Sequence, residues 1–282
     1  MNYPVSITSK SATEGDWIYQ DEAPGSVGYF TEQCGQHALE GRILFNQKME
    51  WPAVLAIHGA RSDFTKMNAL LFPLQKQGAS TMSFHMSGHS LASKVAINAT
   101  SLKNNLAEAT HFFEKLDGRP CTVIGHSLGG ALACKLVAAY PDRIANLVLF
   151  CPAIYGESAY RYPFGASFKD AISIPYGFLD SDSFQALYEF KGTVILVIGQ
   201  YDGLCSFAHG KNKGISAGLV HVDGVERYSA IPKQVIDKIK ASVPEQQLQQ
   251  ITLPGCDHAI STWLRNNPAQ AKKIAASIAA QL

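Results

Sequence analysis

The chain has 282 residues, of which 46% are hydrophobic and 17% charged, so it is long enough to bury a sizeable core. No uninterrupted apolar run approaches the roughly 18 residues of a membrane-spanning helix, and the first residues lack the basic start and apolar stretch of a secretory signal. The net charge of +1, with neither sign gathered into a long run, argues against nucleic acid or an anionic membrane as the main partner. We therefore expect a soluble, globular, cytoplasmic protein without stable membrane insertion, and the sequence leaves its oligomeric state open.

The cysteines form no C-x-x-C pair and no other spacing typical of metal ligands. Several of them lie inside or beside apolar runs, which favours small buried side chains over reactive thiols. We therefore expect no metal site built on the six cysteines, which are Cys34, Cys121, Cys134, Cys151, Cys205 and Cys256.

The first predicted elements are two antiparallel strands at one edge of a sheet, within residues 25–46. Further apolar runs rich in branched residues follow them and lack the polar alternation of a half-exposed strand. Such runs are typical of strands that are covered on both faces. The strands predicted from these runs lie within residues 53–59, 79–85, 121–127, 144–153, 193–199 and 248–255.

Helical periodicity lies between these runs. One predicted helix follows Ser101, a residue type that caps helix N-termini, and the final one begins at Pro268. Alternating strands and helices predict an α/β fold, with a mostly parallel central β-sheet and helices on both faces. The apolar residues at helical spacing are Leu102, Leu106, Ala109, Phe113 and Leu116 in the first helix, and Ile274, Ile278 and Leu282 in the last.

The stretch VIGHSLGGALA, residues 123–133, contains the pattern G-x-S-x-G. A strand-like run precedes the pattern and a helix-like run follows it, which is the context of a nucleophile elbow. In such a turn Ser127 takes a strained conformation that lifts its hydroxyl clear of the sheet, and Gly125 and Gly129 let the strand and the helix pack closely. The alternative is an ordinary glycine-rich turn whose serine has no chemical role.

A serine hydroxyl needs a base to take its proton, and the base needs a carboxylate to hold its tautomer. After an elbow of this kind the expected chain order is serine, acid, histidine. Asp202 follows the predicted strand within 193–199, and His258 lies in the loop after the last predicted strand. Asp223 is the rival acid. The alternatives without a catalytic role are an ordinary turn aspartate at position 202 and a solvated loop histidine at position 258.

The oxyanion that forms during acyl transfer needs backbone N–H donors that already point at it. We expect one from Leu128, the residue after the nucleophile, and the other from the loop after the first apolar strand, at Ala60 or Arg61. His58 and Gly59 are interpreted as residues that shape this loop.

Two further histidines compete with His258 as the base by residue type. His85 and His89 follow an earlier predicted strand, within residues 79–85, rather than the last one. We therefore interpret both of them as loop-packing residues.

Four stretches carry a resemblance to a known family: HGARSD, GHSLGGALA, GQYD and GCDHAI, in this order along the chain. From about Gly25 to the C-terminus the chain resembles the α/β-hydrolase superfamily, specifically its single-domain serine hydrolases with a small cap, such as esterases and thioesterases. The resemblance implies the following roles: Ser127 as nucleophile, His258 as general base, Asp202 as its orienting acid, and the backbone of Ala60 and Leu128 as oxyanion hole.

We expect a single α/β-hydrolase domain over residues 1–282 with two insertions. Aromatic residues crowd together within 153–190, where the alternation of strands and helices breaks, and we interpret this segment as a small cap. The interval between Asp202 and His258 is longer than the resemblance leads one to expect, so residues 203–229 are interpreted as a further insertion. The loop after His58 lacks the glycine-rich run of many lipases, which argues against a large, interfacially activated lipase.

The function expected from these residues is hydrolysis of a carboxylic ester or thioester through an acyl-serine intermediate. The aromatic cap favours an apolar or aromatic acyl group on a small-molecule substrate. Side chains and water complete this chemistry, so no cofactor or metal is implied. The alternatives are an acyltransferase, an amidase or peptidase with the same residues, and a catalytically silent ligand-binding protein.

Overall fold

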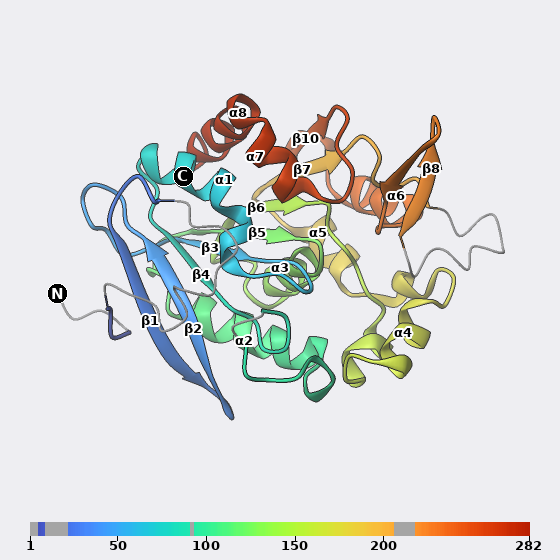
Figure 1. The fold of residues 1–282 in the computed structure, drawn as a ribbon, viewed down its shortest axis with the longest axis horizontal. Coiled ribbons are helices and arrows are strands. Elements are labelled where there is room, and N and C mark those ends of the chain that lie inside the picture. Colours follow the sequence, from blue (N-terminus) through green and yellow to red (C-terminus); the bar gives the residue numbers. More distant parts are fainter. Residues whose placement is uncertain (1–4, 9–21, 91–92, 206–217) are drawn as a thin grey trace.

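The computed structural model describes residues 5–8, 22–90, 93–205 and 218–282. Its centre is an eight-stranded sheet with the strand order β1-β2-β4-β3-β5-β6-β7-β10 (Figure 1). The pairs from β4 to β10 are parallel, whereas β1 with β2 and β2 with β4 are antiparallel, so the predicted mostly parallel sheet is confirmed. The strands are β1 Val27–Cys34, β2 His37–Leu44, β3 Val54–Ile57, β4 Thr81–Phe84, β5 Cys121–His126, β6 Ile144–Phe150, β7 Thr193–Gly199 and β10 Leu248–Leu253.

Each predicted apolar run contains one strand of the sheet, and the predicted antiparallel pair, β1 and β2, lies at one edge. Every residue of β3 is buried. Leu55 and Ile57 belong to one hydrophobic core, and Val54 and Ala56 belong to another. Successive side chains of a strand point to opposite faces, so a strand that is apolar at every position needs cover on both sides.

Helices supply this cover in two layers, one on each face of the sheet (Figure 1). None of the helices in the described residues combines the length and the apolar character that a bilayer crossing requires. The first layer holds α2 Leu102–Glu114, α3 Leu128–Ala139, α5 Ser183–Glu189 and α6 Lys233–Ser242; the second holds α1 Asn68–Lys76, α7 Ile260–Asn266 and α8 Pro268–Ala279. Short 3₁₀ helices are η2 Phe64–Met67, η3 Ile97–Ala99 and η7 Glu245–Gln247.

The ends of α2 and α8 test the helix predictions. The Ser101 side chain accepts a hydrogen bond from the Asn104 N–H at 3.2 Å, so the predicted N-cap of α2 is confirmed. Helix α8 begins at Pro268 as predicted but ends at Ala279. Leu282 lies beyond that end and is 54% exposed, so the prediction that the final helix carries it is wrong. Leu116 likewise lies beyond Glu114, the last residue of α2, so its predicted place in the first helix is also wrong. The last turn of a helix lacks partners for its carbonyl groups and unwinds easily.

The segment 153–190, which we propose as a cap, packs on α3 through a buried lysine. It contains η4 Glu157–Arg161, α4 Ala166–Ile172, η5 Gly177–Asp180 and α5. The ammonium group of Lys135 in α3 forms ion pairs with Glu157 and Asp182 and lies 4.9 Å from the ring centre of Tyr160. Because the Lys135 side chain is only 7% exposed, these partners offset the loss of its hydration.

The second proposed insertion, residues 203–229, is described only in part, because residues 206–217 lie outside the described residues. Its described end forms a two-stranded antiparallel hairpin of β8 Leu219–Val222 and β9 Val225–Tyr228. No pattern in the sequence predicts these strands. In Figure 1 the hairpin stands beside α6, on the side of the molecule that also carries α4.

Candidate active site

Ser127 lies at a sharp turn between β5 and α3. Its backbone has φ 52° and ψ −115°, a region that is strained for a residue with a side chain. A Cβ atom at Gly125 would lie 2.4 Å from the Gly129 carbonyl oxygen, and one at Gly129 would lie 2.3 Å from the Ile57 carbonyl oxygen. Both glycines are therefore required by the close approach of strand and helix, as the sequence predicts for an elbow.

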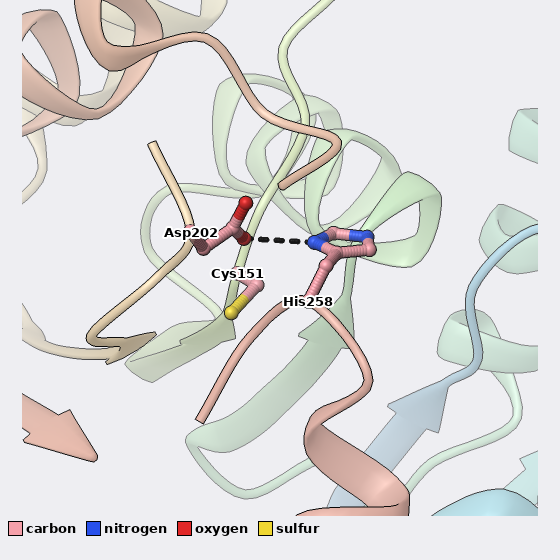
Figure 2. A group of neighbouring side chains, drawn as sticks. All are labelled: Cys151, Asp202 and His258. Atoms are coloured by element: carbon pink, nitrogen blue, oxygen red, sulfur yellow. Dashed lines mark hydrogen bonds and ion pairs between the residues drawn. The ribbon is translucent and has the colours of Figure 1, made fainter. Parts of the chain in front are cut away.

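A continuous chain of hydrogen bonds joins Ser127, His258 and Asp202. The Ser127 Oγ lies 2.9 Å from Nε2 of His258. Nδ1 of the same ring lies 2.7 Å from Oδ2 of Asp202 (Figure 2). The other carboxylate oxygen accepts from the backbone N–H groups of Gly203 at 3.1 Å and Ile231 at 3.3 Å. Since a carboxylate only accepts, Nδ1 carries the proton, and Nε2 is left to accept from the serine hydroxyl.

Two other aspartates, Asp223 and Asp257, have different surroundings. Asp223 is exposed in the turn between β8 and β9, with φ 51°. Asp257 accepts hydrogen bonds from the backbone N–H groups of Tyr228 at 3.0 Å and Ala259 at 2.9 Å, so it shapes the loop. The carboxylate that contacts the His258 ring therefore belongs to Asp202.

The predicted oxyanion donors are the backbone N–H groups of Leu128 and of Ala60 or Arg61. Leu128 is the first residue of α3, a position whose N–H has no acceptor within the helix. Ala60 lines the same pocket as Ser127, whereas the N–H of Arg61 donates to Nδ1 of His89 at 3.3 Å. Of the two candidates in this loop, Ala60 is therefore the one whose N–H is left to meet a substrate.

His58 is buried below the loop that carries Ala60. Its Nδ1 donates to the Gly59 carbonyl at 2.7 Å, and its Nε2 accepts from the Met86 N–H at 3.0 Å. Burial, the largest cause, lowers the pKa of His58 below its ordinary value, so the ring stays neutral at neutral pH. These contacts agree with the predicted role of His58 in shaping the loop.

His85 and His126 pack on aromatic rings. The His85 ring is stacked on Phe64 with 4.0 Å between the ring centres. The His126 ring lies against that of His258, with 5.6 Å between centres and 29° between planes. Both rings are buried, and neither contact gives them access to a substrate.

We expect the protein to lose stability as the pH falls from 7 to 5, because buried histidines stay neutral in the fold. Burial, the largest cause, lowers the pKa of His85 and His126 to about 3 and that of His89 to about 4. The unfolded chain takes up protons at these residues near pH 6.5, so below that pH the unfolded state binds more protons. Each histidine then lowers the free energy of unfolding by about 2 kcal/mol between pH 7 and 5, or by about 6 kcal/mol for all three.

Urea unfolding at the two pH values measures this loss. The matched variant is His85→Phe, because a phenyl ring can stack on Phe64 and does not titrate. Its loss between pH 7 and 5 should be smaller than that of the unchanged chain by about 2 kcal/mol. Equal losses in the two proteins would contradict the assignment of this pH dependence to buried neutral histidines.

Cys151, Asp202 and His258 form the one group of possible metal ligands found among the described residues (Figure 2). One ligand atom from each lies within 4.8 Å of the others, and such donors are suitable for Zn²⁺. However, Nδ1 of His258 already donates to Asp202, and burial raises the pKa of the Cys151 thiol well above its ordinary value. A metal here would have to displace both protons and break the chain of hydrogen bonds to Ser127, so these residues fit proton transfer better than metal binding.

A pocket of about 210 Å³ opens at Ser127 between the proposed cap and the β8–β9 hairpin. Tyr155 and Phe178 line it from the cap, and Tyr228 lines it from the hairpin. The carbonyl oxygen of Tyr228 also accepts a hydrogen bond from the backbone N–H of His258 at 2.7 Å. The rings of the two residues meet edge to face, with 5.2 Å between their centres. No motif in the sequence singles out Tyr228, although it lies inside the proposed insertion 203–229.

Comparison with known proteins gives one family match and several distant relatives. The family model described as "Serine aminopeptidase, S33" matches residues 51–173, a span that includes Ala60 and Ser127 and ends before Asp202 and His258. The "Probable serine hydrolase" of Drosophila melanogaster is 23% identical over 158 residues, which cover 53% of this chain and 46% of that protein. The aligned stretches cover between 13% and 46% of the curated relatives that the chain matches.

Solved structures resemble nearly the whole chain. The thioesterase domain from the curacin biosynthetic pathway superposes with a TM-score of 0.60 at 15% identity, over 88% of this chain and 99% of that one. Est1E from Butyrivibrio proteoclasticus, solved with ferulic acid bound, superposes with a TM-score of 0.61 at 17% identity, over 87% and 97%. At these identities the likeness shows the fold.

Proposed function

We propose that the chain, which shares the α/β-hydrolase fold, is a serine hydrolase of that superfamily and cleaves a carboxylic ester or thioester through an acyl-serine intermediate. The observation that carries the proposal is the hydrogen-bond chain from Ser127 through His258 to Asp202. In this proposal Ser127 is the nucleophile, His258 the general base and Asp202 the residue that orients it. The N–H groups of Ala60 and Leu128 form the oxyanion hole.

The proposed reaction has two balanced steps. The Ser127 oxygen attacks the carbonyl carbon while Nε2 of His258 takes the hydroxyl proton, and Asp202 stabilises the resulting imidazolium. The oxyanion accepts from the N–H groups of Ala60 and Leu128, and its collapse breaks the bond to the leaving group, which takes the proton from His258. Water, deprotonated by the same ring, then attacks the acyl-serine carbonyl. The tetrahedral intermediate collapses with cleavage of the bond to Ser127, the acid leaves, and the ring returns its proton to the Ser127 oxygen.

The pocket favours a small, uncharged acyl group. Its volume of about 210 Å³ lies below the roughly 300–1,000 Å³ of sites for drug-sized ligands. Among the described residues that line it there is no Asp, Glu, Lys or Arg, and the aromatic rings of Tyr155, Phe178 and Tyr228 offer flat apolar surface. Est1E, a structural neighbour, was solved with an aromatic acid bound, and the curacin neighbour is a thioesterase; both likenesses support aromatic or apolar acyl esters and thioesters.

An aminopeptidase is the second candidate, because the matching family model is described by that activity. Such an enzyme must hold the free ammonium group of its substrate, for which a carboxylate is the usual partner. The described lining of the pocket supplies none, since the carboxylate of Asp202 faces His258. Esters and thioesters are therefore the substrates that the pocket lining supports over peptides.

Two assays test the proposal together. A fluorophosphonate probe should label the folded protein at Ser127, and p-nitrophenyl esters and acyl-CoA thioesters of graded length should be hydrolysed, with short or aromatic acyl groups preferred. Hydrolysis of amino-acid p-nitroanilides tests for aminopeptidase activity. Added alcohols or amines test for acyl transfer, because an acyltransferase would form their esters or amides. A folded protein without labelling and without turnover would contradict the proposal and favour a ligand-binding protein.

A further inference from the structure

A chain of buried hydrogen bonds runs from the loop that carries Ala60 into helix α2. The Arg61 N–H donates to Nδ1 of His89 at 3.3 Å, and Nε2 of His89 lies 2.9 Å from Oδ1 of Asn105. The Asn105 amide donates in turn to the Glu108 carboxylate at 3.1 Å. His89, Asn105 and Glu108 are 5%, 0% and 3% exposed, so water does not replace these partners.

The direction of each hydrogen bond in this chain follows from its last member. A carboxylate only accepts, so Asn105 directs its NH₂ group at Glu108 and its oxygen at His89. The His89 ring must then carry its proton on Nε2, which leaves the lone pair of Nδ1 facing the Arg61 N–H. Burial lowers the pKa of His89 to about 4, so the ring keeps this neutral form at neutral pH.

The loop held by His89 is strained and lies against the nucleophile. Arg61 has φ 51°, a left-handed conformation that is strained for a residue with a side chain. A Cβ atom at Gly59 would lie 3.2 Å from Cβ of Ser127, so the loop passes in contact with the elbow. Surrounding contacts must hold such a backbone, and the bond from Arg61 to His89 fixes the peptide next to Ala60.

We propose that His89 is a positioning residue for the oxyanion hole: it binds the Arg61 N–H, keeps that group away from the substrate and holds the Ala60 N–H toward the oxyanion. This inference rests on the proposed function and gives His89 a specific role where the sequence indicates only loop packing. Asn105 and Glu108 act behind it by fixing the tautomer of the ring.

The test compares His89→Phe, His89→Ala and His89→Gln with the unchanged full chain, on the p-nitrophenyl ester that it hydrolyses best. Phenylalanine keeps the edge-to-face packing on Phe164, whose ring centre lies 4.8 Å away, and removes both ring nitrogens. Glutamine offers an oxygen to Arg61 and an NH₂ group to Asn105. Because loss of one oxyanion donor costs about 10²–10³ in kcat, we expect the misplaced donor in His89→Phe and His89→Ala to lower kcat about 10- to 100-fold.

In these two variants KM should change less than about twofold, and the Ki of a trifluoromethyl ketone, whose adduct with Ser127 carries the oxyanion, should rise by the same factor as kcat falls. His89→Gln should recover kcat to within about fivefold of the unchanged chain. The control is Phe164→Leu, which alters the ring contact and keeps every hydrogen bond of His89, and its kcat should stay within about twofold. Melting temperatures identify any variant that does not fold, and the remaining ones carry the comparison.

The experiment distinguishes failure of the proposed function from failure of the role of His89. An unchanged chain that neither hydrolyses esters nor reacts with the ketone overturns the proposed function and the inference with it. An active chain whose folded His89→Phe variant keeps its kcat, or changes KM alone, overturns only the role of His89. Failure of glutamine to recover kcat while Phe164→Leu also loses it would show that packing at this position matters and hydrogen bonding does not, which also overturns the inference.

Discussion

Ser127→Ala is expected to lower ester or thioester turnover by at least a thousandfold, and by up to about 10⁶ if the three residues act as a unit. The reason is that alanine has no hydroxyl to form the acyl intermediate, while the N–H groups of Ala60 and Leu128 still stabilise an oxyanion formed by water. The measurement is kcat/KM on the best ester of the panel, together with labelling by the fluorophosphonate probe. Labelling should disappear completely.

The matched control is Ser277→Ala in α8, whose hydroxyl accepts a hydrogen bond from Gln249 at 2.8 Å on the far layer of helices. This variant should keep full activity and labelling. Alanine at position 127 takes the same strained backbone as serine, so the melting temperature of Ser127→Ala should stay close to that of the unchanged chain. Turnover within about tenfold of normal in folded Ser127→Ala would contradict the nucleophile assignment.

The sheet was predictable because its strands carry a simple signal. A strand such as β3 is covered on both faces, and every one of its side chains is buried, so an uninterrupted apolar run marks it. The elbow was predictable because a Cβ atom at Gly125 or Gly129 would lie only 2.3–2.4 Å from a backbone carbonyl oxygen, which excludes every residue other than glycine. Asp202 follows β7 and His258 follows β10, and the carboxyl ends of these parallel neighbours lie at the same edge of the sheet. The order of serine, acid and histidine along the chain was therefore enough to predict that Asp202 and His258 pair.

The hairpin of β8 and β9 was not predictable from a pattern. Its strands have four residues each, and most of those residues are exposed or half-buried, so no apolar run or alternation marks them. Its contact with the site depends on the hydrogen bond from the backbone N–H of His258 to the Tyr228 carbonyl, which joins residues that are distant in sequence. The role inferred for His89 depends likewise on Arg61 and Asn105, which lie 28 and 16 positions away. Composition and periodicity contain no information about such long-range contacts.

Asp202→Asn is expected to lower kcat about 10⁴-fold, whereas Asp223→Asn should leave it unchanged. An asparagine at 202 can direct its NH₂ group at Nδ1 of His258, which moves the ring proton to Nε2. That nitrogen would then donate to Ser127 instead of accepting its proton, although all heavy atoms keep their places. The pair of variants removes the same charge from the two acids that compete in the sequence, so any difference reports position and not net charge.

The double variant Ser127→Ala with Asp202→Asn sharpens this prediction, because residues that act as a unit do not add. If Asp202 works only through His258 and Ser127, the double variant should be no slower than Ser127→Ala alone, since the residual rate comes from water and the oxyanion hole. A further large loss would mean that Asp202 also supports the fold, through the bonds it accepts from Gly203 and Ile231. A normal kcat in folded Asp202→Asn, with a large loss in Asp223→Asn, would contradict the assignment of the acid, because the exposed turn of the hairpin would then have to reach His258.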